Sequence, residues 1–298
     1  MKNHHILPTA YIVGAQKSGT TTIYNWLSQH PDIYGNQAAK DFPFFSELSL
    51  YQKGEKELSK YFHKKQQQRV VLGGEASLMY ESGAVARLYA TIPNSLVIVI
   101  LRNPVERCFS SWRYAIERGI ETRSFDEAIA EELAGCKYSE AWQARQKDYL
   151  KHSRYSKQLE EIYEYFPRSK VKLLLYDDLV HRPHKMVKII LEFLEVNREF
   201  TPDLTIKNKT RGGMRSTFLG KILYKNRARA AFTSRILRKI TSTGIRMRIR
   251  ESLISFNRVE APTAQLEANL KIKLIKYFGN EINYLEKELK VELGGWKE

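Results

Sequence analysis

Short apolar runs alternate with longer amphipathic stretches along the first two thirds of the chain. Four runs are predicted to be buried strands: Tyr11–Val13, Val70–Leu72, Ser95–Leu101 and Val171–Tyr176. Each is followed by residues with helical spacing. Strands without an exposed face, separated by helices, are typical of a parallel sheet covered on both sides. The pattern therefore predicts an α/β fold of three layers, with a central parallel sheet flanked by helices.

The amphipathic stretches supply the helices of this fold. The predicted helices are Thr20–Gln29, Pro104–Arg118, Leu150–Phe166, Lys185–Phe193 and Gln265–Leu289. Pro104 stands where a proline favours a helix start, and Gly119 follows as an end signal. Thr201–Thr217 is predicted to be a loop. Because no internal repeat or low-complexity tract occurs, residues 1–298 are interpreted as one domain with a helical, basic C-terminal subregion.

The composition indicates a globular protein rather than a membrane-spanning or disulfide-bonded one. The longest unbroken apolar run, Leu96–Leu101, is far shorter than the roughly 20 residues of a membrane helix. The first residues, MKNHHILPTA, lack the apolar region of a signal peptide. Cys108 and Cys136 lack metal-ligand spacing, and we expect both to be buried small apolar side chains. We expect a soluble, cytoplasmic protein.

Basic charge is concentrated in one part of the chain. The sequence has 49 Lys and Arg against 33 Asp and Glu, a formal net charge of +16 that favours anionic partners. Thirteen Lys or Arg but only two Glu fall within Arg211–Glu260. This basic block could receive a polyanion or nucleic acid, face a membrane surface, or form solvated helix faces.

The segment AYIVGAQKSGTTTIYNWL has the layout of a phosphate-binding loop between a strand and a helix. Gly14 and Gly19 keep the glycine spacing of G-x-x-x-x-G-K-[ST], but a threonine occupies the lysine position and Lys17 lies inside the loop. Such a loop can still hold a phosphate at the helix N-terminus, although it is poorly suited to a triphosphate. The groups available are the backbone amides and hydroxyls of Ser18, Gly19, Thr20, Thr21 and Thr22.

The end of the third predicted strand also differs from that of a P-loop ATPase. There, an acidic residue usually helps to hold magnesium, whereas this strand ends in Leu101 and Arg102. A cation in place of an anion predicts direct binding of a second negative group without a metal ion. Arg102 and Ser110, on either side of Pro104, are the residues expected to hold that second phosphate. The alternative is a structural salt bridge for Arg102 and a helix-surface hydroxyl for Ser110.

With both phosphate segments in view, the sequence resembles the sulfotransferases that use 3′-phosphoadenosine 5′-phosphosulfate (PAPS). The segments similar to their loop for the 5′-phosphosulfate and their segment for the 3′-phosphate are GAQKSGTTTIYNWL and VILRNPVERCFSSW. Further similarity, to the carbohydrate group that includes heparan sulfate enzymes and bacterial relatives, lies in KDFPFFSE, RYSKQLEEIYEYFPRSKVKLLLYDDL and EINYLEKELKVELGGW. The resemblance implies a bacterial enzyme that moves a sulfuryl group from PAPS to a hydroxyl or amine of a glycan, releasing the bisphosphate PAP.

The resemblance also implies roles for residues that do the chemistry. Sulfuryl transfer builds charge on the leaving oxygen, which Lys17 can stabilise from within the loop. An acceptor hydroxyl must lose a proton, and Glu75 in GGEASLMY matches the family's catalytic glutamate. Ala76 and Leu78 depart from the family's usual lysine and proline. The alternative for Glu75 is a structural role, such as pairing with Arg87.

Several weaker candidates complete the predicted site. Lys40 and Tyr155 are expected near the substrate, although Lys40 could also be a plain surface lysine. A loop over the nucleotide is expected to use Lys209, Arg211 and Gly212, against the alternative of an ordinary turn. His63 is a rival base on a stretch expected to be exposed, and His30 is interpreted as a partner of a helix C-terminus.

Two other functions remain open at this point. A P-loop kinase with an unusual loop would consume ATP with magnesium, and a nucleic-acid or anionic-polymer binding protein would use the basic block. No zinc, RNP-like or helix-turn-helix signature accompanies that charge, so we expect no nucleic-acid partner. The sequence identifies neither the acceptor nor the oligomeric state.

Overall fold

The computed structural model of the chain describes residues 5–136, 138, 141–204, 213–214, 258–259 and 265–298. They fall into two compact units, each described by itself below. The first unit contains Met1–Arg107, Lys151–Asn208 and Leu274–Glu298, and the second contains Cys108–Leu150 and Lys209–Lys273. That residues 1–298 form one domain therefore stays a prediction.

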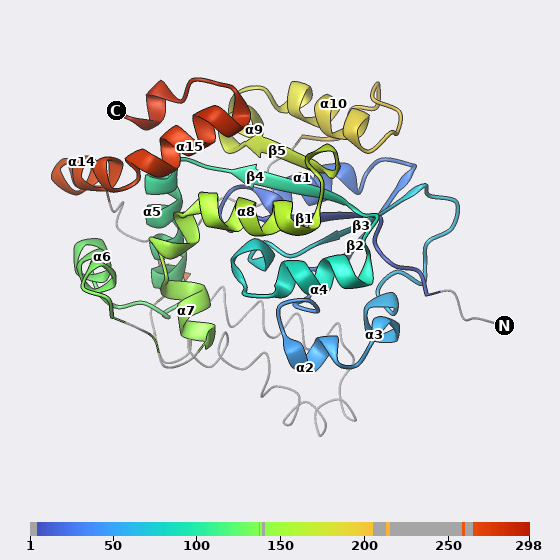
Figure 1. Cartoon of the computed structure of the whole chain (residues 1–298), viewed down its shortest axis with the longest axis horizontal. Helices are drawn as coiled ribbons and strands as arrows, with labels where there is room; N and C mark the ends of the chain where they lie inside the picture. The colour runs from blue at the N-terminus through green and yellow to red at the C-terminus, as the bar shows by residue number, and fades with distance from the viewer. Residues whose placement is uncertain (1–4, 137, 139–140, 205–212, 215–257, 260–264) are drawn as a thin grey trace. The chain divides into compact units, whose positions relative to one another are not determined.

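A five-stranded parallel sheet forms the centre of the first unit (Figure 1). The strands are β1 (Ala10–Gly14), β2 (Ile33–Lys40), β3 (Val70–Gly74), β4 (Leu96–Leu101) and β5 (Val171–Leu175). Their order is β2-β3-β1-β4-β5, so the first strand lies in the middle and pairs with β3 and β4. All residues of β1 and β3 are buried, as their continuous apolar sequences predict. The predicted α/β fold is confirmed.

Helices cover both faces of this sheet (Figure 1). The helices of the first unit are α1 (Thr20–Leu27), α2 (Leu48–Tyr51), α3 (Glu55–Ser59), α4 (Ala84–Thr91), α8 (Tyr155–Tyr165), α9 (Tyr176–His181), α10 (Pro183–Phe193) and α15 (Gly279–Leu289). On one face, Ile23 of α1 and Ile190 of α10 join Ile12 and Ile98 of the sheet in one apolar core. On the other face α4 packs against α8, and α15 packs against α8 in turn. Covering both faces explains why the strands carry little polar alternation.

The sequence pattern missed one strand and misplaced several helix ends. The strand β2, with the sequence IYGNQAAK, is partly exposed and carries no apolar run, so its hydrophobicity gave no signal. The helix predicted over 150–166 begins only at Tyr155, after a short 3-10 turn. The one predicted over 265–289 is two helices, α14 (Ala268–Tyr277) and α15. Within the predicted loop 201–217, Gly213–Met214 instead forms a short strand, β6, paired with β7 (Arg258–Val259).

The C-terminal segment is attached to the first unit by polar contacts. Glu281 of α15 accepts hydrogen bonds from the backbone N–H and the hydroxyl of Ser156, both at 2.9 Å. The indole N–H of Trp296 donates to Asp177 Oδ2 of α9 at 2.7 Å. Residues more than a hundred positions apart in the chain are thus joined directly.

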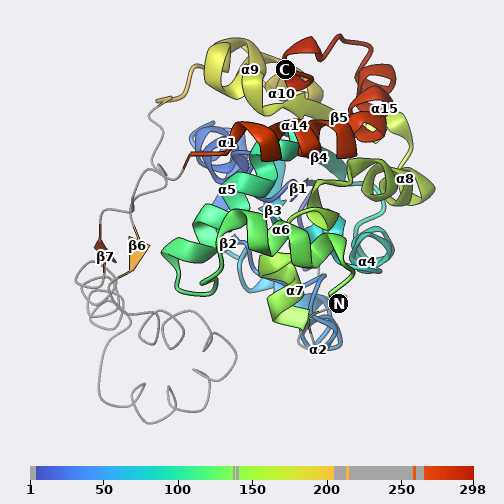
Figure 2. The ribbon, with the colours of Figure 1, turned by 90° about the vertical axis from the view of Figure 1, so that its left-hand side faces the viewer.

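Aromatic packing and a helix cap organise the second unit. It includes most of α5 (Pro104–Glu117), α6 (Phe125–Leu133) and α7 (Ala141–Lys147). Phe125 packs edge-on against Phe109 of α5 with ring centroids 5.2 Å apart, and Figure 2 shows the two helices side by side. Ser124 and Glu127 form a reciprocal capping box at the start of α6. Cys108 is buried as expected, but Cys136 is exposed, because it follows the end of α6 in a turn.

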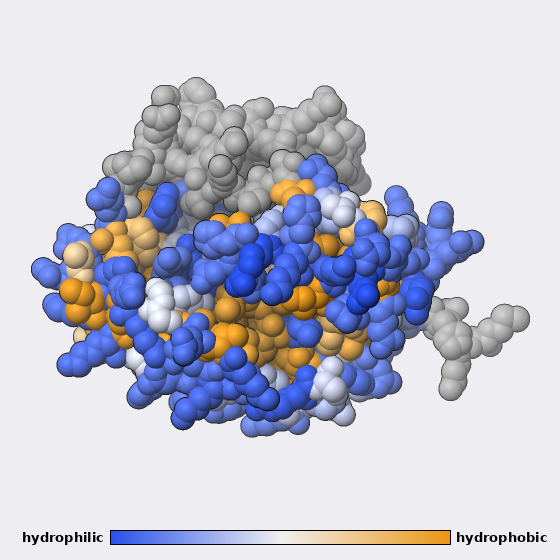
Figure 3. Space-filling model, turned by 90° about the horizontal axis from the view of Figure 1, so that it is seen from above, coloured by the Kyte–Doolittle hydropathy of each residue, from blue (hydrophilic) through white to orange (hydrophobic). Residues whose placement is uncertain are grey.

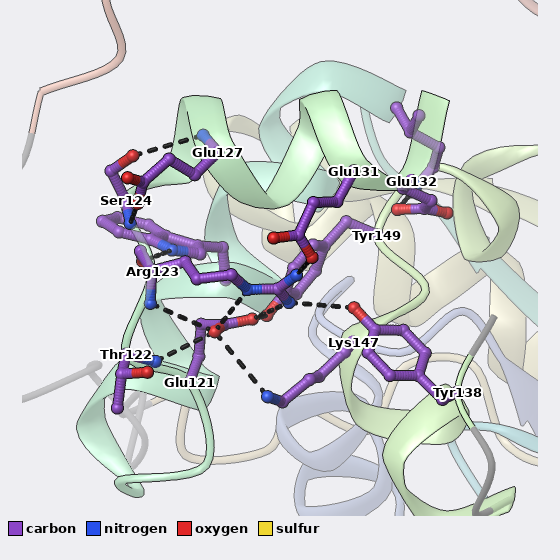
Figure 4. A network of polar contacts seen from close by, with 12 residues as sticks. Glu121, Thr122, Arg123, Ser124, Glu127, Glu131, Glu132, Tyr138, Lys147 and Tyr149 are labelled. Carbon is purple, nitrogen blue, oxygen red and sulfur yellow. Dashed lines mark hydrogen bonds and ion pairs between the residues drawn. The ribbon is translucent and has the colours of Figure 1, made fainter. Parts of the chain in front are cut away.

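A buried carboxylate, Glu121, is the centre of a polar network in the second unit (Figure 4). It is 2% exposed and pairs with the Arg123 guanidinium, with Nη2 at 2.6 Å from Oε2. The backbone N–H groups of Thr122 and Arg123 and the hydroxyl of Tyr149 also donate to it. Burial alone would raise the pKa of Glu121. The hydrogen bonds from the Arg123 side chain and from the two backbone N–H groups, together with the nearby charge of Lys147, instead lower this pKa to about 2. Burial and the Glu121 charge raise the pKa of Tyr149.

Several large apolar side chains reach the surface. Those that are exposed among the described residues are Leu48, Tyr89, Leu133, Val180, Ile272 and Val291. Figure 3 shows a face on which hydrophilic residues predominate and hydrophobic ones emerge between them. In the part of the chain that the structure describes, no helix has the length and apolar character needed to cross a membrane.

We expect the stability of the second unit to fall steeply in acid. The folded pKa of Glu121, about 2, lies below its ordinary value of 4.5, so its stabilisation is present above that value and is lost as the pH falls toward 2. This shift in the pKa of Glu121 corresponds to about 3 kcal/mol of unfolding free energy. Urea unfolding of the wild type and Glu121→Gln between pH 6 and pH 2.5 measures it.

The control is Glu131→Gln, since the Glu131 side chain binds the same arginine but is 49% exposed. We expect this variant to keep most of the acid sensitivity. If the free energy of unfolding fell equally with pH in the wild type and in Glu121→Gln, Glu121 would not be the source of the acid sensitivity.

Candidate active site

The predicted phosphate loop connects β1 to α1 in the first unit. Ala15 N–H donates to the carbonyl of Ile100 in β4 at 2.8 Å, which fixes the loop to the neighbouring strand. Lys17 has φ of 72° and Gly19 has φ of 83°, both in the left-handed region. A Cβ on Gly19 would lie 2.8 Å from Leu179 Cδ1, so glycine is needed for both conformation and space. The loop is a tightly packed turn.

The N-terminus of α1 carries no side-chain cap from a described residue. Within the described part of the chain, Gly19 provides no side-chain cap, and the first turn of α1 holds no acidic residue. Ser18 is fully buried, and its hydroxyl has no hydrogen-bond partner among the residues that the structure describes. Thr20 and Thr22 are buried, and Thr21 is half-buried. An uncapped helix start with an unused buried hydroxyl is suited to phosphate or sulfate oxygens.

Arg102 lies against this loop. Its Nη1 is 3.4 Å from the carbonyl oxygen of Lys17, and its guanidinium lies 4.4 Å from the ring centroid of Tyr176. Nη2 also pairs with Glu106 Oε2 at 2.9 Å. The structure therefore contains the salt bridge that was the alternative interpretation of Arg102. Because Glu106 is exposed, this pair contributes little to stability, and the arginine still lies beside the loop.

Two tyrosines hold Arg102 in place. The ring of Tyr176 contacts the guanidinium, and its Cδ2 would be 3.4 Å from a Cβ at Gly19, so it touches the loop as well. The Tyr155 hydroxyl donates to the Arg102 carbonyl at 3.0 Å. Tyr155 is fully buried, and its expected role near the substrate stays a prediction.

The helix that follows Arg102 begins with a cap that the sequence analysis overlooked. The side chain of Asn103 accepts the Val105 N–H at 2.9 Å. An asparagine immediately before a helix-starting proline is a recognisable N-cap signal. Ser110 lies half-buried on α5, in the part of that helix that belongs to the second unit.

Glu75 directly follows β3 and is 2% exposed. Its backbone N–H donates to the carbonyl of Ile12 at 2.9 Å, at the carboxyl end of the sheet where α/β folds present ligand-binding residues. Its Oε1 accepts a hydrogen bond from Ser46. Arg87 donates to the carbonyl of Phe45 at 2.5 Å.

Lys40 ends the neighbouring strand β2, in register with Gly74. Its side chain is only 4% exposed, which excludes the interpretation of a plain surface lysine. Its ammonium binds Asp41 Oδ1 at 2.6 Å, and the same oxygen accepts the Ala76 N–H at 2.9 Å. The structure thus brings Lys40 and the segment after Glu75 together through Asp41. No sequence signal singled out Asp41 or Ser46.

The two histidines take structural positions. His30 Nδ1 accepts the Asp32 N–H at 3.0 Å, and Nε2 lies 3.0 Å from the Asn197 carbonyl. The ring therefore connects two loops, whereas the sequence predicted an interaction with the dipole at a helix C-terminus. His63 is exposed, as expected, beside the carbonyl of Lys60. The expected nucleotide-loop residues Lys209, Arg211 and Gly212 lie outside the described residues, as does most of the basic block.

The comparison with family models decides the family. Residues 7–217 match the model described as "Sulfotransferase domain", which covers the loop, Arg102 and Glu75. The chain belongs to the sulfotransferase family. The resemblance read from the two phosphate segments is thereby confirmed.

Known sulfotransferases similar to this one include carbohydrate enzymes. The mouse protein "Heparan sulfate glucosamine 3-O-sulfotransferase 3A1" is 25% identical over 69% of this chain and 50% of its own length. "Membrane-associated sulfotransferase kil1" of Dictyostelium discoideum is 32% identical over 37% of this chain and 24% of its own. The chain spans about half the length of the first of these relatives.

A solved structure supports the same fold. A sulfotransferase from Alicyclobacillus acidocaldarius superimposes with a TM-score of 0.70 over 98% of this chain and 100% of its own, at 22% identity. At that identity the likeness establishes the fold, including the sheet that carries the loop and Glu75.

We expect Gly19→Ala to destabilise this sulfotransferase by about 1–2 kcal/mol, because alanine disfavours a positive φ and its Cβ meets Leu179. Urea denaturation curves provide the measurement. Gly295→Ala is the matched control, since a Cβ there has no atom within 4 Å. Equal unfolding midpoints for the two variants would show that the loop is not held as described.

Proposed function

We propose that this protein transfers the sulfuryl group of PAPS to a carbohydrate hydroxyl. The observation that carries the proposal is the place of the Arg102 guanidinium, next to the Lys17 carbonyl and beside the uncapped start of α1. Two anion-binding groups on adjoining segments suit a nucleotide with two separate anionic ends. A magnesium-dependent kinase would need an acidic group where Arg102 stands.

Each end of the donor would have its own set of groups. The 5′-phosphosulfate would bind the Lys17 ammonium and the backbone and hydroxyl groups of residues 18–22, including the buried Ser18 hydroxyl that has no other described partner. Arg102 would bind the 3′-phosphate, a charge-assisted contact for the guanidinium. A contact from Ser110 to this phosphate is proposed from the sequence alone. Lys209, Arg211 and Gly212 are proposed to cover the nucleotide on the resemblance alone.

The reaction needs a base and a cation on opposite sides of the sulfur. Glu75 would take the proton of the acceptor hydroxyl while the new O–S bond forms. The bond between sulfur and the bridging oxygen breaks, and PAP leaves with Lys17 stabilising its 5′-phosphate. No metal ion is required in this scheme. No group of three or more His, Cys, Asp or Glu side chains suited to a metal ion occurs in the described ranges, and metal independence remains a proposal.

The carbohydrate acceptor is proposed from the heparan sulfate relatives. The basic block of residues 211–260 would suit an acidic glycan, since it carries thirteen of the Lys and Arg residues. An amine acceptor is the alternative within the same chemistry.

We expect the protein to bind PAP without magnesium, and Arg102→Ala and Lys17→Ala each to weaken that binding at least about tenfold. Isothermal titration calorimetry measures both. Arg182→Ala is the control, because Arg182 also pairs with an acidic residue four positions away, Asp178, in the reverse order along the chain. A wild-type protein that does not bind PAP would refute the proposal.

We expect Glu75→Gln to lower kcat about 10²–10⁴-fold while PAP affinity changes little, because a proton acceptor acts mainly in the transition state. Transfer of labelled sulfate from PAPS to a panel of glycans provides the rate, and calorimetry provides the affinity. Full activity of the variant would exclude Glu75 as the base.

A further inference from the structure

The segment 41–47 encloses Glu75 at the carboxyl ends of β2 and β3. Asp41 N–H donates to the carbonyl of Gly74 at 2.8 Å, and Asp41 Oδ1 accepts the N–H of Ala76 at 2.9 Å. The residues immediately before and after Glu75 are therefore both bound to Asp41. Asp41 has φ of 61°, a turn conformation that sends the chain away from β2 toward Ser46.

Ser46 is fixed in position by the residues before it. Phe44 and Phe45 are fully buried, and Phe45 packs edge-on against Tyr11 of β1 with ring centroids 5.4 Å apart. Glu47 N–H closes a turn onto the Pro43 carbonyl at 3.0 Å. The backbone is anchored on both sides of Ser46. The Ser46 hydroxyl is therefore already held where it donates to Glu75 Oε1.

The surroundings of Glu75 give this hydrogen bond its importance. The side chain is 2% exposed, and burial without donors favours the protonated form of a carboxyl group. Among the groups near it are Tyr11, whose pKa is raised by burial and by the Glu75 charge, and Asp41, which accepts the N–H of the next residue, Ala76. The Ser46 hydroxyl is a neutral donor that stabilises the ionised carboxylate and fixes its rotamer.

We propose that Ser46 is a positioning residue that keeps Glu75 ionised and aimed for proton abstraction. The inference rests on the proposed function, in which Glu75 is the base. It assigns a function to a serine that sequence analysis did not select.

The test compares Ser46→Ala, Ser46→Thr and the control Ser49→Ala, whose serine is exposed on α2. We expect Ser46→Ala to lower kcat about tenfold, as for loss of a hydrogen bond to a charged group. PAP affinity should stay within about twofold, because the nucleotide groups lie on other segments. The acid limb of the pH–rate profile should move to higher pH, because the ionised carboxylate loses a donor. Ser46→Thr, which keeps the hydroxyl, should restore most of the rate.

A second readout requires no acceptor. A ¹³C NMR titration of the carboxyl group, assigned with Glu75→Gln, should show a higher midpoint in Ser46→Ala than in the wild type and Ser49→Ala. If the wild type binds PAP and Glu75→Gln is inactive, an unchanged profile and midpoint in Ser46→Ala would overturn this inference alone. Failure of wild-type PAP binding would overturn the proposed function and this inference together.

Discussion

The contact between the Tyr176 ring and the Arg102 guanidinium is the constraint on which the candidate site depends. The ring lies 4.4 Å from the guanidinium and also packs beside Gly19, where any Cβ would collide with α9. An arginine side chain has many rotamers, and a site that binds anions gains when one of them is held in advance. Tyr176 and Glu106 supply that restriction at the guanidinium, and the Tyr155 hydroxyl holds the backbone of the same residue.

The sequence was most informative where one physical requirement dominated. Buried strands such as Leu96–Leu101 must be apolar on both faces, so the sequence predicted the ends of this strand to within one residue. The glycine spacing predicted the turn between β1 and α1, because a left-handed residue packed against a neighbouring helix must be glycine. The strand β2 escaped because its edge position and partial exposure allow Gly, Asn and Gln.

Contacts between distant residues were beyond the same reasoning. The hydrogen bond from the Tyr155 hydroxyl to the Arg102 carbonyl joins residues 53 positions apart, and no sequence pattern predicted it. Ser46 and Glu75, and Glu121 and Tyr149, likewise meet only because the backbone brings them together. Hydrophobic periodicity says which side of an element faces the core, but it does not say which polar groups will satisfy one another there.

The bond from Trp296 to Asp177 has a consequence for biosynthesis. Asp177 adjoins Tyr176 in α9, so the support beneath Arg102 is itself secured by an indole made 119 residues later. During synthesis, α9 gains this anchor only after the chain has grown by the 119 residues that separate Asp177 from Trp296. Until then, the helix whose residues contact Gly19 and Arg102 would lack this hydrogen bond.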